Sequence, residues 1–198
     1  DIHTFMPLLR GRIKQVNPFI RQFLIGWIVM LDSVPDIELI EFLPEFLDGL
    51  FNMVSDPNKE IRQQADTALV DFLRDIHNQP DADLCRMVPI LVEHCGSKDE
   101  FTMKTAINWI KDFVELGRER LLEHYADILA AILPCTAHSG NLAADIQDAS
   151  FATNKVLLTM VNETDVDFEI EHICTTLTGV LNDEKVDTRL ASMQWFNM

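Results

Sequence analysis

The sequence contains little glycine and few aromatic residues. Glycine occurs seven times in 198 residues, and aromatic residues make up 8% of the chain. Long stretches are instead rich in Leu, Ile, Asp and Glu, and 47% of all residues are hydrophobic. Such a chain can bury a core and is not a disordered tail. The composition therefore predicts a folded, mostly helical protein.

Positive charge is also scarce. The 16 Lys and Arg residues face 32 Asp and Glu residues, which gives a formal net charge of −16. Binding of nucleic acid needs clustered Lys and Arg to contact phosphates. The overall negative field also opposes direct binding to an anionic membrane. We therefore expect no nucleic acid partner, and we expect any membrane association to be indirect.

Long hydrophobic runs and paired cysteines are missing as well. No apolar run reaches the length of a membrane-spanning helix, and no secretory signal peptide is visible. The cysteines form no CxxC pair and lie within apolar helical patterns, which predicts buried free thiols in a reducing cytosol. They are Cys85, Cys95, Cys135 and Cys174.

Motifs for catalysis or cofactor binding do not occur. The chain has no phosphate-binding loop, no GxSxG elbow and no HExxH motif. His94 adjoins Cys95, and His172 lies near Cys174, but neither pair has a second ligand pair at zinc spacing. We therefore expect no catalytic residues, no cofactor and no bound metal, which excludes an enzyme.

Apolar residues recur at helical spacing along the whole chain. The predicted first and second helices cover residues 3–15 and 18–34, 37–54 and 58–77, 82–95 and 98–116, 118–137 and 141–161, and 166–181 and 184–198. They pair into five hairpins at about 3–34, 37–77, 82–116, 118–161 and 166–198. Four first helices carry an internal proline between apolar residues, which predicts a bend in each helix. These prolines are Pro7, Pro44, Pro89 and Pro134.

A longer period overlies the helical one. Polar residues at separations of 41, 42, 43 and 42 occupy the early part of each second helix: Arg21, Arg62, Lys104, Gln147 and Arg189. An Asp or Asn precedes each later member by five or six residues: Asp56, Asp99, Asn141 and Asp183. A two-helix unit of about 40–47 residues is the HEAT/armadillo repeat. The sequence therefore predicts an all-α, right-handed α-solenoid of about five hairpins, a single domain over residues 1–198 that is a piece of a longer array.

These recurring polar residues and their Asp or Asn companions, together called the polar ladder, have two interpretations. Its members could bond to carboxylates or carbonyls at the hairpin turns and hold one repeat in register with the next, or they could line a groove for an acidic partner. The fixed offsets of the Asp and Asn companions favour the structural role, for Arg21, Asp56, Arg62, Asp99, Lys104 and Arg189. Core packing is likewise expected for Trp27, Trp109 and Trp195, with partner hot spots as the alternative.

The turns at residues 55–60, 97–100, 139–141 and 182–185 recur at the same period and should lie along one edge. They are polar, and residues on such loops are better placed for recognition than residues within the stack. The sequence therefore predicts a partner-binding edge with Lys59, Glu60, Lys98 and Asp99 as rim charges.

One segment is more specific than this general pattern. Residues 31–51, LDSVPDIELIEFLPEFLDGLF, together with Glu60-Ile61-Arg62, resemble the Vac-fourteen family of vacuole-morphology scaffolds, which includes ArPIKfyve of the PIKfyve complex. The likeness is strong from about residue 5 to residue 72. It is weaker but in register around residues 92–95 and 131–135, and thin after residue 141.

The resemblance implies a non-catalytic HEAT scaffold on the cytosolic face of endosomes and of vacuoles or lysosomes. It implies that the scaffold recruits a FYVE-containing phosphoinositide 5-kinase and its opposing Sac-type phosphatase, and so regulates phosphatidylinositol 3,5-bisphosphate. It also implies self-association through regions outside this chain. The alternative is another HEAT or armadillo adaptor, such as an importin-like or trafficking receptor that binds extended peptides. The family-specific segment near Asp36 favours the scaffold.

Overall fold

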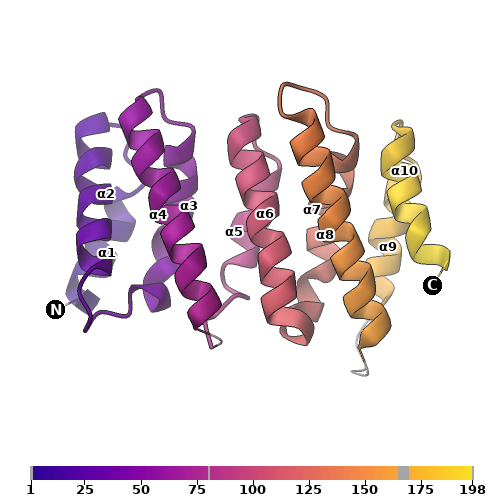
Figure 1. Ribbon diagram of the computed structural model, residues 1–198, viewed down its shortest axis with the longest axis horizontal. Helices are drawn as coiled ribbons and strands as arrows, with labels where there is room; N and C mark the ends of the chain where they lie inside the picture. The colour runs from indigo at the N-terminus through magenta and orange to yellow at the C-terminus, as the bar shows by residue number, and fades with distance from the viewer. Residues whose placement is uncertain (1, 80, 165–169, 198) are drawn as a thin grey trace. The chain divides into compact units, whose positions relative to one another are not determined.

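The computed structural model describes residues 2–79, 81–164 and 170–197 (Figure 1). Every regular element in these ranges is helical, which confirms the predicted all-α fold. No helix within them is long and apolar enough to cross a membrane. The chain divides into two compact units, residues 1–83 and residues 84–198.

The first unit contains two helical hairpins. Its elements are α1 (Ile2–Arg12), α2 (Pro18–Asp32), the 3-10 turn η1 (Leu39–Phe42), α3 (Leu43–Val54) and α4 (Lys59–Asn78). Helix α3 packs against α4 within its hairpin, while α1 packs on α3 and α2 packs on α4. First helices therefore stack on first helices and second helices on second helices, as in a repeat array.

The second unit continues this pattern through three further hairpins. The first is α5 (Val88–Cys95) with α6 (Glu100–Gly117). The next is formed by η2 (Arg118–His124), α7 (Tyr125–Ile132), η3 (Leu133–Ala137) and α8 (Ala143–Glu163). The last is α9 (Ile170–Val180), α10 (Val186–Met193) and η4 (Gln194–Asn197). Helix α7 packs on both α5 and α9, and α6 packs on α8.

Stacked helical hairpins agree with the predicted solenoid, while the HEAT class, the right-handed superhelix and a single continuous domain over 1–198 stay predictions. The predicted start of the last hairpin at residue 166 lies outside the described residues. The other predicted helices are found, but their ends differ. In particular, residues 118–137 form 3-10, α and 3-10 segments where one helix was predicted.

Three prolines lie at the start of a helical segment. Pro44 and Pro89 lie in the first turn of α3 and α5, and Pro134 lies in the first turn of η3. The first turn does not use the N–H that proline lacks, whereas a proline further inside would remove a backbone hydrogen bond. Pro89 therefore begins its helix, where an internal position was predicted, whereas Pro44 and Pro134 lie where a 3-10 and an α segment meet. The predicted bends stay predictions. Of the four, Pro7 alone lies inside its α-helix.

Large side chains fill the space between the helices of each unit. In the first unit, the rings of Phe46 and Phe72 are fully buried and their centroids are 5.7 Å apart. Gly49 of α3 lies so close to Ile13 that a Cβ would be 2.0 Å from its side chain. In the second unit, Trp109 is buried beside Phe113, with ring centroids 5.7 Å apart, which confirms the expected core position of Trp109.

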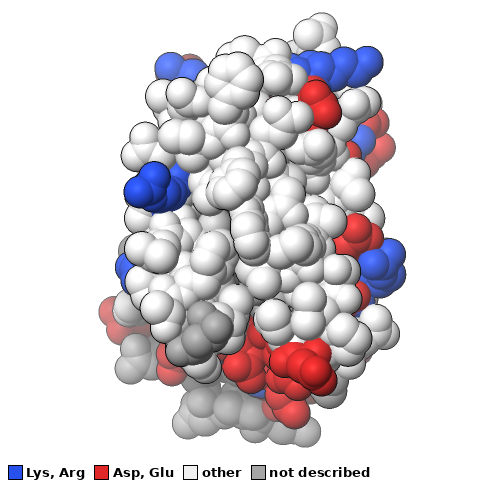
Figure 2. All heavy atoms as spheres, turned by 90° about the vertical axis from the view of Figure 1, so that its left-hand side faces the viewer, with Lys and Arg blue, Asp and Glu red and all other residues white. Residues whose placement is uncertain are grey.

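The other two tryptophans differ from each other. Trp195 is buried and donates a hydrogen bond from Nε1 to Asn154 Oδ1 at 2.8 Å, so its core position is confirmed. Trp27 is 37% exposed and lies beside Phe5 and Phe23 on the outer face of α1 and α2, so its predicted core position is wrong. Figure 2 shows that the middle of this face carries no charged side chains.

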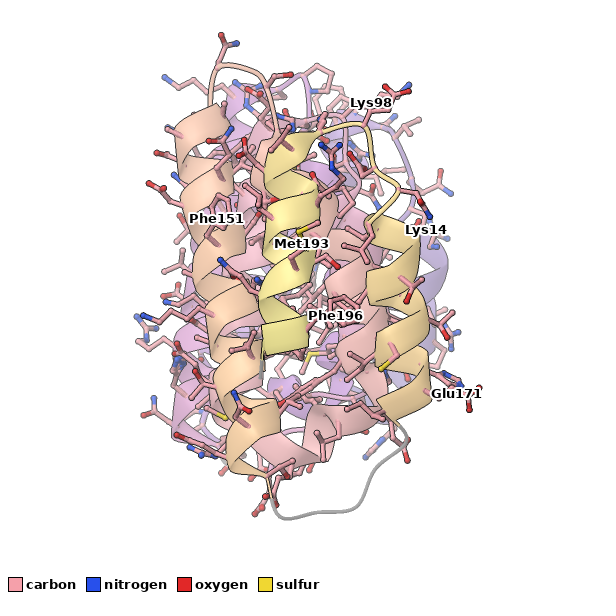
Figure 3. All side chains as sticks on the ribbon, turned by 90° about the vertical axis from the view of Figure 1, so that its right-hand side faces the viewer. Lys14, Lys98, Phe151, Glu171, Met193 and Phe196 are labelled. Carbon is pink, nitrogen blue, oxygen red and sulfur yellow. The ribbon has the colours of Figure 1, made fainter. Side chains whose placement is uncertain are left out.

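The C-terminal hairpin also presents apolar residues to solvent. Met193 is 47% exposed and Phe196 is 53% exposed, and both lie on the side of the second unit that Figure 3 presents.

Among the cysteines, Cys95 and Cys135 are buried as predicted. Cys85 is half-buried and Cys174 is exposed on α9, so the prediction of four buried thiols is wrong for these two.

Candidate interaction surface at the hairpin turns

The turn between α3 and α4 is built around a buried carboxylate. Asp56 is 4% exposed, and one of its oxygens accepts a hydrogen bond from the backbone N–H of Asn58 at 2.8 Å. The other oxygen forms an ion pair with the guanidinium of Arg21, whose side chain is 12% exposed. Arg21 belongs to α2 in the preceding hairpin, and its Nε also donates to the Gln15 carbonyl at 2.8 Å. Arg21 therefore joins its own turn to the next one.

Arg62 of α4 contacts the backbone of the same turn. Its Nη1 donates to the backbone carbonyls of Asp56 at 2.7 Å and Pro57 at 3.0 Å. Arg189 repeats this geometry in the last hairpin, donating to the carbonyls of Asp183 at 2.7 Å and Glu184 at 3.0 Å. The two arginines thus close the turn that leads into their own helix, because a guanidinium can span two carbonyls at once.

The remaining ladder positions have different partners. Gln147 Nε2 donates to the His138 carbonyl at 2.8 Å, which again closes its own turn. Lys104 forms a 2.5 Å ion pair with Asp145 of the following hairpin. Asp99 has a capping role. Its carboxylate caps α6 by accepting from the N–H and the hydroxyl of Thr102, at 2.9 and 2.8 Å.

Glu100 makes the contact between turns that sequence reasoning missed. Its Oε2 accepts from the backbone N–H groups of Asn141 and Leu142 at 3.0 and 3.1 Å, and its Oε1 lies 2.9 Å from His138 Nε2. The hydrogen bond with His138, helped by the two backbone amides, lowers the pKa of Glu100 below its ordinary value. The only signal in the sequence is that Asn141 follows Glu100 by 41 residues, one repeat length.

Hydrogen bonds join three successive turns of the second unit along one edge. Glu100 links the 97–100 turn to the 138–142 turn. Lys185 Nζ then donates to the Ala137 carbonyl at 3.0 Å, which links the last turn to the one before it. Within this unit, these hydrogen bonds therefore link the three turns into one row.

The four predicted rim residues divide between the units. Lys59 and Glu60 begin α4 in the first unit and are exposed. Lys98 is exposed in the second unit, where Asp99 is half-buried as the cap of α6. Lys59, Glu60 and Lys98 thus carry charges that are accessible to a partner, while Asp99 has a structural contact of its own.

No group of three or more His, Cys, Asp and Glu side chains is placed to hold a metal ion in the described part of the chain. Burial raises the pKa of Cys135 to about 11 and raises that of Cys95 still further. A thiol with a raised pKa is a poor nucleophile near neutral pH, because the thiolate is the reactive form.

Comparison with known proteins gives relatives of one kind. The sequence is 47% identical over 197 residues to "Protein VAC14 homolog" of Arabidopsis thaliana, an alignment that covers all of this chain and 26% of that protein. It is 26% identical to the protein of the same name from Schizosaccharomyces pombe, over a 265-residue alignment that covers 98% of this chain and 32% of the relative.

A third relative has a more descriptive name. "Vacuole morphology and inheritance protein 14" of Saccharomyces cerevisiae is 40% identical over 76 residues, which cover 38% of this chain and 9% of that protein. No protein-family model matches the sequence. The chain thus spans about a third or less of the length of each of these relatives.

Proposed function

The chain belongs to the Vac14 family, and from this premise we propose that it is a scaffold segment that brings a lipid kinase and a lipid phosphatase together on a membrane surface. The observation that carries the proposal is the 47% identity to the Arabidopsis relative over the full length of the chain. The name of the budding-yeast relative connects that protein with vacuole morphology. Stacked helical hairpins suit a scaffold because they present long surfaces to partners.

The proposed partners follow from the resemblance of residues 5–72 to the Vac-fourteen family. They are a FYVE-containing phosphoinositide 5-kinase and the opposing Sac-type phosphatase, so that the complex regulates phosphatidylinositol 3,5-bisphosphate. The scaffold acts at the cytosolic face of endosomes and of vacuoles or lysosomes, and its membrane association is indirect through these enzymes. The reaction belongs to the partners, so this chain contributes position and no catalytic residue.

The hairpin turns are the proposed contact with the kinase. Lys59, Glu60 and Lys98 are exposed at the beginnings of second helices. The helix faces next to them are occupied by packing: Ile61 and Leu69 of α4 are fully buried. A partner that recognises the charged side chains at the turns can therefore bind without disturbing the buried core.

A charge-reversal experiment tests this contact. Single rim charges contribute little, so Lys59→Glu and Lys98→Glu are combined in one variant. The tagged chain is used to recover kinase from cytosol, and immunoblotting measures the kinase. The expected result is a loss of kinase, with helicity and melting temperature unchanged.

A matched double variant serves as the control. Lys111→Glu with Lys155→Glu gives the same change in net charge on the middle of α6 and α8, away from the turns. This control should recover kinase normally. Loss of kinase with the control but not with the turn variant would place the interface on the second helices, and recovery of basic cargo peptides in place of a kinase would favour the adaptor alternative.

A further inference from the structure

The first hairpin exposes a row of aromatic side chains on α2. Phe19 is 80% exposed, Phe23 is 63% exposed and Trp27 is 37% exposed, and they recur every four residues along the helix. The face to which Trp27 belongs carries no charged side chains in its middle (Figure 2). A terminal repeat that ends at solvent needs a polar outer face to stay soluble. This face therefore has the character of a contact surface.

The repeat itself shows what such a face contacts. Positions can be counted from the polar residue that opens each second helix: Arg21, Arg62, Lys104, Gln147 or Arg189. Trp27 is at position six of α2 and is exposed, whereas the residues at position six of the four later second helices are all buried: Ala68, Ile110, Thr153 and Trp195. Helix α4 packs on α2, and α8 packs on α6. Position six is therefore a position that a preceding second helix covers.

The last hairpin shows the reverse at position seven. Phe196 occupies this position and is 53% exposed, with Met193 also exposed on the same side of the second unit (Figure 3). The residues at position seven of the four earlier second helices are buried or half-buried: Ile28, Leu69, Lys111 and Asn154. Position seven is thus one that a following hairpin covers.

One contact within the second unit joins these two positions directly. Trp195, at position six of its hairpin, donates from Nε1 to the side chain of Asn154, at position seven of the preceding second helix. Asn154 Nδ2 also lies 3.4 Å from the Ala191 carbonyl, so the two second helices meet along this row. The same contact between the two exposed faces brings Trp27 against Phe196. Both faces belong to this chain, so a second copy supplies the missing half of each.

Local charge favours this pairing. Residues 1–35 contain four Lys and Arg against two Asp and Glu, whereas residues 141–198 contain three against ten. Turns that lead into second helices are linked to each other in the second unit, so the same stacking brings exposed Lys14, before α2, towards exposed Glu184, before α10. The net charge of −16 opposes self-association, but physiological salt screens charges beyond about 8 Å, so contacts within the interface decide.

We infer that copies of this chain associate head to tail, with α10 and Phe196 of one copy on α2 and Trp27 of the next. The interface reuses the contact by which one hairpin stacks on another within the chain. It goes beyond the proposed function and concerns surfaces other than the turns that carry Lys59 and Lys98.

Sedimentation velocity of the purified chain tests this inference without any kinase. A small apolar contact should be weak, so the mean mass should rise above that of the 22.6 kDa chain between about 1 and about 200 µM. A head-to-tail interface leaves one face free at each end, so species larger than a dimer should form at the highest concentrations. A chain that stays monomeric throughout this range would overturn the inference and leave both faces to another occupant, such as a further helical hairpin.

Two variants and their mixture identify the contact. Trp27→Glu and Phe196→Glu each place a charge on one of the two faces, and each alone should weaken association by about tenfold or more. An equimolar mixture should recover a dimer that grows no further, because each variant keeps the face that the other has lost. Phe101→Glu makes the same change at an exposed Phe of α6 and should associate as the unmodified chain does.

The same variants separate head-to-tail association from other contacts. Association of Phe196→Glu alone, with loss only in Trp27→Glu, would show two α2 faces in contact and would refute the inference. A mixture that stays monomeric would refute it as well. If Trp27→Glu does not fold by circular dichroism, Phe23→Glu takes its place, since Phe23 is more exposed on the same helix. The turn variant Lys59→Glu with Lys98→Glu should leave association unchanged, so failure of the kinase contact and failure of this inference are distinguishable.

Discussion

Replacing Arg21 with Met removes one partner of the most buried ion pair described in the first unit. The Asp56 carboxylate, 4% exposed, would keep the N–H of Asn58 as a donor but lose its cation. Removing one partner of a buried pair typically costs about 3–5 kcal/mol, because the remaining charge is left without compensation. Since one donor remains, we expect a loss near the lower end of that range.

Urea unfolding followed by circular dichroism measures this loss. With an m-value of about 2–3 kcal/mol per molar urea, a loss of about 3 kcal/mol lowers the midpoint by about 1 M. Arg10→Met is the matched control, because Arg10 forms a 3.8 Å pair with Glu45 while 70% of its side chain is exposed. An exposed pair of this kind contributes about 0–1 kcal/mol, so the midpoint should hardly move.

The double variant Arg21→Met with Asp56→Leu separates the two parts of the effect. It removes the unpaired carboxylate as well as the guanidinium, so it should recover part of the stability lost in Arg21→Met. If Arg21→Met costs no more than Arg10→Met, the ion pair does not hold α2 against the following turn, and the reasoning from burial is wrong.

Three further predictions concern the second unit. Trp109→Ala should cost about 3–5 kcal/mol in urea unfolding through lost packing, and a loss below about 1 kcal/mol would contradict its burial. Because the pKa of Glu100 is lowered in the fold, its contribution should be complete above the ordinary value of 4.5 and disappear as the pH falls through the lower folded value. The melting temperatures of the unmodified chain and Glu100→Gln should therefore differ near neutral pH and converge in acid. Iodoacetamide should alkylate exposed Cys174 before Cys135, whose pKa is raised to about 11, and the reverse order by mass spectrometry would refute this.

The period of 41 to 43 residues predicted where the second helices lie in the sequence, because their apolar faces and turn residues repeat together. Local pattern could not decide burial at Trp27, which has the same helical context as Trp109. Its exposure depends on which helix lies beside α2, and that is a tertiary property. The predicted helix boundaries were similarly limited, since Pro44, Pro89 and Pro134 can bend a helix or begin one.

The contacts of polar residues were harder to predict than the helices. Glu100 looks like an ordinary acidic residue in the first turn of a helix, yet its carboxylate reaches the next turn. Asn154 falls within an apolar helical pattern, and only the structure shows that it accepts from the Trp195 ring N–H. Such contacts depend on side-chain geometry between hairpins, which one sequence does not encode as a pattern. The rim residues Lys59 and Lys98 stay predictions.

Each bond between neighbouring hairpins spans about one repeat of sequence. Arg21 and Asp56 are 35 residues apart, while Lys104 and Asp145, and Asn154 and Trp195, are 41 apart. A longer turn would therefore enlarge one closed loop and leave the register of other hairpins intact, and doubling a loop costs only about 0.6 kcal/mol in closure entropy. A turn of this chain can thus lengthen while the helices that frame it keep their contacts.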